Sequence, residues 1–349
     1  SYREALGFNP NFAEAHSSLG TTLKELGRLD HAEVSYRQAI ALKPKYAEAR
    51  YNLANLLTDL GNLDEAETNF EHALALKPGY TDAHNNLAGL LFQRGDDIGA
   101  LRSWRETLSL RRDSSAATAY EQNTTLHISK AKVSHDIEQY EYLASKSIKR
   151  DYFLELAAQY RDIRDKISWP SDTGMVVVDP RLKPSLANSF RLLNYFDASR
   201  VDQAVNSSIE VGEIYDQYFS HEFGLTYVDN LLTQDALERL RRHLLESTIW
   251  FDAKRGGYLG AYMNEGLASP LILQIASELR AIFPAILKEH PLRQAWAYKY
   301  DSKSSIPESD TTGIRTHADF AAVNVNFWVT KSKANLDPDS GGLVIHHTE

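Results

Sequence analysis

The sequence contains no cysteine, and this absence removes several kinds of structure at once. With no Cys among 349 residues there is no disulfide, no thiolate zinc site and no iron–sulfur cluster, so any metal must be bound by His, Asp or Glu. No apolar run is long enough to cross a bilayer, so we expect no membrane partner. Positive charge is also scarce: 38 Lys and Arg against 47 Asp and Glu give a net charge of -9. This balance argues against nucleic-acid binding through phosphate neutralisation.

A chain of this length has room for two or three domains, and its first third repeats itself. Glycines and prolines recur at one constant interval, at Gly27, Gly61 and Gly95 and at Pro10, Pro44 and Pro78. A period of about 34 residues marks tetratricopeptide repeats, pairs of helices that bury their apolar faces only by stacking on neighbours. Residues 1–112 are therefore predicted to form an all-α solenoid. Three full repeats run from Asn11 to Arg112, and Ser1 to Pro10 is the tail of another.

One polar position of the repeat predicts a partner. Ser18, Asn52 and Asn86 occupy equivalent places on the first helix of each repeat, whose residues line the concave groove of such solenoids. The segment Ala83–Ala88 resembles the repeats of O-linked N-acetylglucosamine transferase, in which asparagines form a ladder along the groove. Side-chain amides both donate and accept hydrogen bonds, so they suit a protein or peptide backbone. The alternative, equally weighted, is that these residues cap or bridge neighbouring helices.

The middle of the chain, residues 113–170, is predicted to be a helical linker between the solenoid and the rest. Asp113–Thr118 is polar and breaks the repeat period. Apolar residues at helical spacing then predict a helix from Ile128 to Ile167, which Trp169-Pro170 ends. His135 and Asp136 are adjacent on this helix and do not face each other, so we interpret them as a solvated or capping pair.

From about residue 171 the composition shifts to strands and loops. Gly174–Asp179 is predicted to be a strand, and a helix is predicted from Thr233, its N-cap, to Leu245. Arg255–Gly260 is a glycine-rich loop without the spacing of a phosphate-binding motif. Ser269-Pro270 is expected to open a second helix that is kinked or ends near Pro284.

A short motif near the end of the chain suggests a metal site. His317 and Asp319 are separated by one residue just before the strand-like segment 322–329. Side chains at i and i+2 of a strand share a face, so the imidazole and the carboxylate can point the same way. With a second histidine from elsewhere they would complete the facial triad of two His and one carboxylate that holds non-haem Fe(II). The motif alone is weak, because a loop histidine beside a solvated aspartate gives the same pattern.

The order of motifs around His317 strengthens the metal interpretation. Trp296–Tyr300, His317-Ala-Asp319, Asn326–Val329 and Asp339–Leu343 together resemble the 2-oxoglutarate and Fe(II) dependent oxygenases, in particular the prolyl-4-hydroxylase-like group. The resemblance implies a double-stranded β-helix, or jelly roll, with flanking helices over residues 171–349. It also implies that Fe(II), 2-oxoglutarate and O2 are the cofactor and co-substrates.

The same resemblance assigns roles to individual residues. His317 and Asp319 would be iron ligands, and Tyr298 and Tyr300 stand where the family often places a phenol near the carboxylates of 2-oxoglutarate. Asn324 and Asn326 alternate with the apolar face of their strand and are candidates to hydrogen-bond the co-substrate. His346 and His347 come too early to be the family's third ligand. We therefore expect the barrel to be partial, with its last ligand and the Arg or Lys that pairs with 2-oxoglutarate beyond Glu349.

Two functions from different classes follow. The first is a multidomain α + β oxygenase, expected to be a hydroxylase, whose repeats recruit a protein or peptide partner. The second is a non-catalytic interaction scaffold in which the C-terminal barrel is degenerate or structural. A cytoplasmic location is the expectation for both. The sequence does not discriminate between protein, peptide and small-molecule substrates, because loops set specificity.

Overall fold

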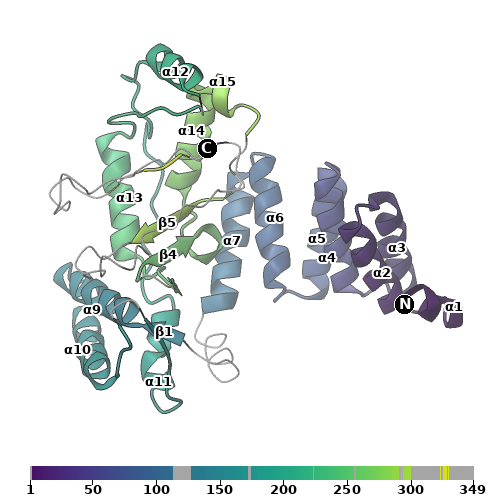
Figure 1. Ribbon diagram of the computed structural model, residues 1–349, viewed down its shortest axis with the longest axis horizontal. Helices are drawn as coiled ribbons and strands as arrows, with labels where there is room; N and C mark the ends of the chain where they lie inside the picture. The colour runs from purple at the N-terminus through teal and green to yellow at the C-terminus, as the bar shows by residue number, and fades with distance from the viewer. Residues whose placement is uncertain are drawn as a thin grey trace. The chain divides into compact units, whose positions relative to one another are not determined.

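The computed structural model describes residues 2–112, 127–171, 174–222, 224–254, 257–290, 292, 294–299, 323, 325–327 and 329. The chain divides into two compact units, Ser1–Arg111 and Arg112–Glu349. We call the first the repeat unit and the second the C-terminal unit. Figure 1 shows their elements, and each unit is described by itself.

The repeat unit consists of paired helices. After α1 (Tyr2–Phe8), the pairs are α2 (Ala13–Glu25) with α3 (Leu29–Leu42), α4 (Ala47–Asp59) with α5 (Leu63–Leu76), and α6 (Thr81–Gln93) with α7 (Asp97–Arg112). Gly27, Gly61 and Gly95 stand between the two helices of each pair with φ of 71°, 80° and 84°, a left-handed conformation that favours glycine. The predicted helix, glycine turn and second helix are therefore observed in all three pairs.

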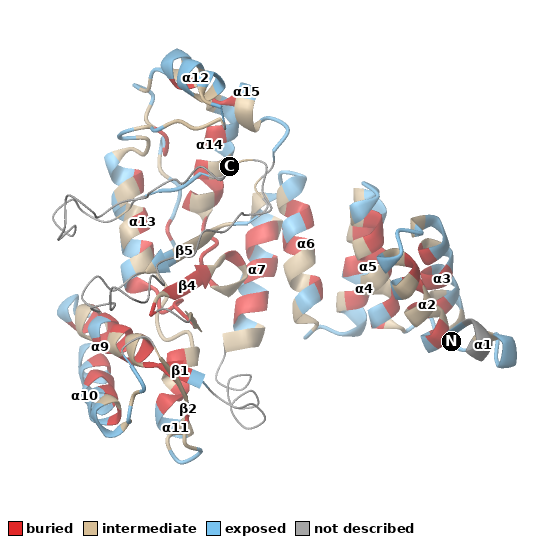
Figure 2. Ribbon diagram, in the orientation of Figure 1, coloured by how far each residue is buried: buried red, intermediate tan, exposed pale blue. Residues whose placement is uncertain are grey.

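The cores of the three pairs use equivalent residues. Tyr36, Phe70 and Trp104 occupy the same position of successive repeats and are all buried on the second helix, where each is preceded one helical turn earlier by a buried alanine. Small residues on the first helix leave space for these rings, at Gly20, Ala54 and Ala88. A Cβ added to Gly20 would lie 2.7 Å from the Tyr36 ring, so the fit at this position is close. Figure 2 shows such buried positions as bands along the helices.

The first part of the C-terminal unit has its own core. Strand β1 (His127–Ser129) pairs antiparallel with β2 (Met175–Val177), and α9 (Lys130–Ser145) packs beside α10 (Arg150–Lys166). Three aromatic side chains are fully buried between these helices: Tyr140, Phe153 and Tyr160. Residues of two short helices, α11 (Lys183–Leu186) and η1 (Ala187–Phe190), pack against the same core. The segment predicted to be a linker therefore supplies a packed layer of the second unit.

The single helix expected from Ile128 to Ile167 was wrong. Ile128 lies in strand β1, and the chain turns between α9 and α10 through Ser147 and Lys149, whose φ angles are 60° and 40°. Non-glycine residues adopt this left-handed conformation rarely. Because no glycine or proline marks the turn, the sequence contained no signal that the helix ends there. Helical spacing on both sides of a short turn resembles one continuous helix.

The rest of the C-terminal unit combines helices with a small sheet. Four helices, α12 (Val211–Ser220), α13 (Gln234–Glu246), α14 (Pro270–Ile282) and α15 (Pro284–Leu287), contribute to a second apolar core. Thr233 caps α13 by accepting a hydrogen bond from the Ala236 amide, and Ser269 caps α14, as their positions predicted. The helix that opens at Ser269-Pro270 ends at Ile282, and α15 then begins at Pro284.

Strands β3 (Asp252–Ala253), β4 (Leu259–Tyr262) and β5 (Trp296–Lys299) form an antiparallel sheet in that order, and η2 (Met263–Glu265) follows β4. In register, Gly260 is opposite both Asp252 and Tyr298, and Leu259 is opposite both Ala253 and Lys299. Among the described residues, the only sheets are this one and the β1–β2 pair, so no jelly roll is seen in that part of the chain.

Candidate functional site

The first candidate site is a group of polar side chains shared by two first helices of the repeats. The Asn86 amide nitrogen on α6 donates to the Asn55 side-chain oxygen on α4 at 2.7 Å and lies 3.1 Å from the Tyr51 hydroxyl. Asn85 donates to the Asn86 oxygen at 3.4 Å. All four side chains are half-buried. We call Tyr51, Asn55, Asn85 and Asn86 the asparagine cluster.

The contacts of the cluster leave part of its hydrogen-bonding capacity unused. Both protons of the Asn86 amide nitrogen are directed at neighbours, which fixes the orientation of this amide. Among the described residues, the Asn55 amide nitrogen, the Asn85 oxygen and the Tyr51 hydroxyl proton have no side-chain partner of their own. A preorganised pair of donors beside an acceptor can bind a peptide group.

An aromatic and charged flank adjoins the asparagine cluster. The Tyr51 and Tyr80 rings are 4.8 Å apart between centroids, and the Lys77 ammonium lies 4.4 Å from the Tyr80 ring centroid. Lys77 also pairs with Glu48 at 3.1 Å. Burial raises the pKa of the Tyr80 phenol, so Tyr80 stays neutral at physiological pH. The flank thus offers the aromatic surface of Tyr51 and Tyr80, and the charge of the adjacent Lys77 is paired with Glu48.

The three residues predicted to line the groove have different surroundings. Asn86 bridges α6 to α4, which is the alternative that the sequence left open. Ser18 and Asn52 are half-buried, and among the described residues neither side chain makes a hydrogen bond to another side chain. Tyr51, Asn55 and Asn85 were not predicted. The sequence did contain a signal for them. Tyr51 and Asn85 directly precede the repeat position of Asn52 and Asn86, and Asn55 lies three residues after Asn52 on the same helix.

The second region of interest is the β3–β4–β5 sheet, whose two faces differ. Because side chains alternate along strands and partners across strands share a face, Asp252, Gly260 and Tyr298 lie on one face and Leu259, Ala261 and Lys299 on the other. We call these the tyrosine face and the lysine face. The predicted co-substrate residue Tyr298 is therefore on the tyrosine face.

The tyrosine face carries a polar group beside its rings. The Tyr262 hydroxyl donates to Asp252 Oδ2 at 3.0 Å, and Lys254 Nζ lies 2.6 Å from the same oxygen. The Tyr258 and Tyr298 rings meet edge to face with centroids 5.4 Å apart. Burial and the neighbouring Asp252 raise the pKa of Tyr262. Burial lowers the pKa of Lys254, but its hydrogen bonds to Asp252 and Tyr262 outweigh this effect and raise the pKa overall.

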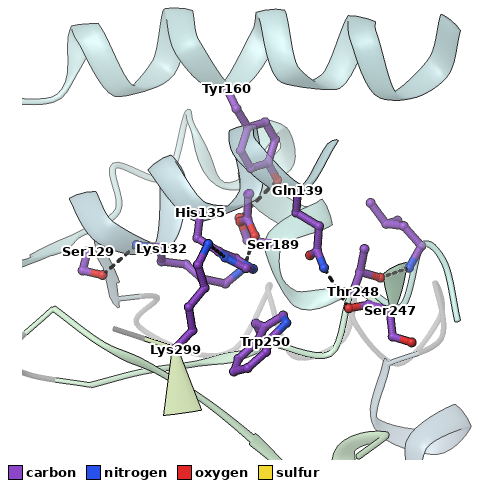
Figure 3. A network of polar contacts seen from close by, with 12 residues as sticks. Ser129, Lys132, His135, Gln139, Tyr160, Ser189, Ser247, Thr248, Trp250 and Lys299 are labelled. Atoms are coloured by element: carbon purple, nitrogen blue, oxygen red, sulfur yellow. Dashed lines mark hydrogen bonds and ion pairs between the residues drawn. The ribbon is translucent and has the colours of Figure 1, made fainter. Parts of the chain in front are cut away.

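Behind the lysine face lies a network of buried polar groups on α9, shown in Figure 3. Lys132 forms an ion pair with Asp136, and the two side chains are only 3% and 4% exposed. The Ser189 hydroxyl donates to Asp136 at 2.7 Å, and the Tyr160 hydroxyl lies 3.2 Å from Ser189. Burial lowers the pKa of Lys132 and raises the pKa of Asp136, while their mutual attraction opposes both changes.

The same network connects α9 to strand β5. Lys299 donates to His135 Nδ1 at 2.9 Å and pairs with Glu138 at 3.1 Å. The His135 ring is buried, its edge meets the Trp250 ring at 5.8 Å between centroids, and its Nε2 atom has no hydrogen-bond partner among the described residues. The interpretation of His135 and Asp136 as a solvated or capping pair was wrong, because both are buried and each has a separate partner.

Most of the predicted metal and co-substrate residues lie outside the described residues. This applies to His317, Asp319, Tyr300 and Asn324, whereas Asn326 is described and exposed. Within the part of the chain that is described, no group of three or more His, Asp or Glu residues is placed to hold a metal ion. The same part contains no helix with the length and apolar character needed to span a membrane.

The fold and period of the repeat unit define its class: the chain contains tetratricopeptide repeats. Three family models match it, a TPR repeat over residues 20–57 and tetratricopeptide repeats over residues 47–80 and 82–114. The second and third matches coincide with the helix pairs α4–α5 and α6–α7, and the first runs from within α2 through α3 to within α4. The comparison with curated proteins found no match.

Solved structures with some similarity include other repeat proteins. MamA is 21% identical, with 48% of this chain and 88% of that chain covered and a TM-score of 0.30. A mutant of the Thermobaculum terrenum O-GlcNAc transferase is 34% identical over 30% of this chain and 21% of that one, with a TM-score of 0.28. The first TPR of Spaghetti (RPAP3), bound to an HSP90 peptide, is 22% identical over 31% and 85%, with a TM-score of 0.28.

Proposed function

We propose that the repeat unit binds an extended segment of a partner protein and that the asparagine cluster is its main polar contact. The supporting observation is the Asn86–Asn55 hydrogen bond of 2.7 Å, which orients an amide between two neighbouring repeats. A peptide group needs one donor and one acceptor at fixed separation, and Asn55 and Asn85 supply these from adjacent helices. The Tyr51 and Tyr80 rings add apolar surface next to them.

The proposal can be tested by using the full chain to select binding peptides from a displayed library of random short sequences. In the variants Asn55→Ala and Asn86→Ala, we expect each selected peptide to bind at least about fivefold more weakly, the usual effect of losing one hydrogen bond. Gln38→Ala is the matched control, because Gln38 is an exposed amide side chain on α3, away from the cluster. Unchanged affinity in both cluster variants would show that the asparagine cluster does not contact the bound peptide.

A second candidate function rests on the sequence motif that follows β5. We propose that the C-terminal unit belongs to an Fe(II) and 2-oxoglutarate dependent oxygenase, with His317 and Asp319 as iron ligands. An imidazole and a carboxylate in a chain without cysteine form a donor set that suits Fe(II). The bound iron and 2-oxoglutarate would activate O2 for oxidation of a C–H bond. Tyr298, on the tyrosine face, together with Tyr300, Asn324 and Asn326, would orient 2-oxoglutarate through hydrogen bonds.

Metal uptake separates the oxygenase from the scaffold alternative. For the oxygenase, 2-oxoglutarate should strengthen the binding of Fe(II) or Mn(II) by the full chain, and His317→Ala or Asp319→Ala should abolish this effect. His290→Ala serves as a matched control, since His290 is an exposed histidine elsewhere in the same unit. A scaffold should show no effect of 2-oxoglutarate on metal binding. Full succinate production by either ligand variant would rule out the assigned ligands.

A further inference from the structure

The contact between His135 and Lys299 exists in only one protonation state. An ammonium group has protons to donate and no acceptor, so the imidazole nitrogen that it approaches must carry a lone pair. Lys299 Nζ lies 2.9 Å from His135 Nδ1, and this geometry requires that the proton of the neutral ring be on Nε2. A second proton on the ring would occupy Nδ1 and break the hydrogen bond.

Burial and the nearby cations of His135 favour the neutral ring. Lys299 from β5 and Lys132 from α9 are the nearby cations. The carboxylate of Asp136 is committed to Lys132 and Ser189, and Glu138 is 66% exposed and therefore a weak counter-charge. Trp250 offers an uncharged ring edge. Gln139, whose amide nitrogen donates to the Leu245 and Ser247 carbonyls, opposes the other neighbours by raising the pKa of His135, but its effect is smaller than theirs. Burial together with the two lysines thus holds the pKa of His135 well below its usual range.

We infer that the His135–Lys299 hydrogen bond is a latch that fastens strand β5 to helix α9 and that acid releases it. Protonation would place a cation on the buried His135 ring 2.9 Å from the Lys299 ammonium, a repulsion that the fold relieves by moving Lys299, which is 39% exposed, towards Glu138 and solvent. The latch joins residues 164 positions apart in the sequence. It therefore links α9 to β5, two elements that are far apart in the sequence.

The consequence for β5 follows from the alternation of its side chains. Lys299 is on the lysine face, and Tyr298 is on the tyrosine face of the same four-residue strand. When Lys299 leaves His135, the strand keeps its pairing with β4, but its buried polar contact with α9 is lost and only the exposed pair with Glu138 remains. We expect β5 to open more often, and the Tyr258–Tyr298 ring contact on its other face to loosen with it.

Hydrogen exchange of the full chain tests the latch directly. We expect the protection factors of the Ala297–Lys299 amides to fall about tenfold or more between about pH 7.5 and about pH 5, after correction for intrinsic exchange. The closed state resists protonation, but once β5 opens, His135 takes up a proton near its ordinary pKa, so acid favours opening. His135→Asn places an amide oxygen near the position of Nδ1 and cannot gain a proton, so its β5 protection should stay constant over this range. Lys299→Met should show the low protection at both values.

Two outcomes would overturn the latch. The first is an equal loss of β5 protection in wild type and His135→Asn, because other groups would then be responsible. The second is wild-type protection in Lys299→Met. Glu138→Gln is the matched control that removes the exposed partner of Lys299, and we expect little change from it.

A measurement on the unmodified protein covers the case in which a variant does not fold. The ¹⁵N shifts of the His135 ring report its tautomer. We expect a neutral ring protonated at Nε2 at neutral pH. A ring protonated at Nδ1, or a doubly protonated ring, would contradict the latch.

Discussion

The repeat unit has ion pairs that recur on its surface, whereas the C-terminal unit, besides exposed pairs of its own, has charged groups buried in its core. In the repeat unit, Lys43–Glu14 and Lys77–Glu48 are the same ion pair in successive repeats, each joins residues separated by 29 positions, and all four side chains are nearly half exposed. In the C-terminal unit, Lys132–Asp136 is almost completely buried, and Lys299 reaches His135 across 164 positions. The pairs of the repeat unit are exposed and periodic. In the C-terminal unit, the Lys132–Asp136 pair lies buried within one helix, and the Lys299–His135 contact joins distant segments.

The difference shows where each unit gets its specificity. A solenoid repeats one packing solution, so its ion pairs follow the period and contribute little to stability because water competes for them. Buried charges, in contrast, are costly to desolvate and remain tolerable only with complete partners. Removing one partner of a buried pair in the C-terminal unit should therefore cost more stability than removing one partner of an exposed pair in the repeat unit. Four tests follow, three on charged or titratable groups and one on packing in the repeat unit.

The largest effect is expected from Asp136→Ala. This change leaves the Lys132 ammonium buried without its counter-charge, and we expect the C-terminal unit to lose about 3–5 kcal/mol of unfolding free energy. Urea unfolding followed by tryptophan fluorescence measures it, since four of the five tryptophans lie after Arg112. The double variant Lys132→Met/Asp136→Leu is the control. It should recover most of the loss, and a loss as large as in the single variant would show that packing rather than charge is responsible.

A pair of glycine changes tests packing in the repeat unit. Gly20→Ala puts a methyl group 2.7 Å from the Tyr36 ring, and we expect it to destabilise the unit by about 1–3 kcal/mol. Gly89→Ala is the matched control within helix α6, where nothing lies within 4 Å of an added Cβ. There, the higher helix propensity of alanine should stabilise by about 0.5–1 kcal/mol. Thermal unfolding by circular dichroism would show the opposite signs, and equal signs would refute the close fit at Gly20.

The third test concerns pH. His135 has a folded pKa below its unfolded value, so the unfolded chain takes up the proton first as pH falls. The stabilisation is complete above the unfolded pKa near 6.5 and is lost as pH decreases below it, with a slope of at most about 1.4 kcal/mol per pH unit. His243 is also buried with a lowered pKa and contributes in the same direction. The difference between the stability curves of wild type and His135→Asn isolates His135, and identical curves would contradict its role.

The smallest effect is expected from Glu48→Gln. The change removes an exposed ion pair with Lys77, and the repeat unit should keep its melting temperature within experimental error. The pKa of Glu48 is lowered by hydrogen bonds from its own backbone and from Lys77, so any small loss should appear only above the carboxylate pKa and should shrink with added salt. A large loss would mean that the periodic pairs stabilise the solenoid more than their exposure suggests.

Local signals in the sequence predicted much of the fold. The constant repeat period located the helix pairs and their glycine turns, and Thr233 and Ser269 marked the starts of α13 and α14. Each of these features depends on residues close together in the chain. The break between α9 and α10 was not predicted, because the turn is made by Ser147 and Lys149 in the left-handed conformation rather than by glycine or proline.

The candidate sites were predictable only in part. Asn86 was identified from its repeat position, but its partner Asn55 lies 31 residues earlier and is recognised only when α4 and α6 are packed together. Tyr298 was singled out by the resemblance of its strand, whereas its neighbour Tyr258 became visible through the register of β4 and β5. The roles of His317 and Asp319 stay a prediction, since both lie outside the described residues.

By itself, the sequence determined the repeats, because their contacts are local and recur at a constant spacing that can be read along the chain. The tertiary structure alone decided that His135 and Asp136 are buried and that they face different partners, Lys299 from β5 and Lys132 from their own helix. No pattern in the sequence announces a contact across 164 positions. Burial, which sets the protonation state of these groups, is a property of the packed fold.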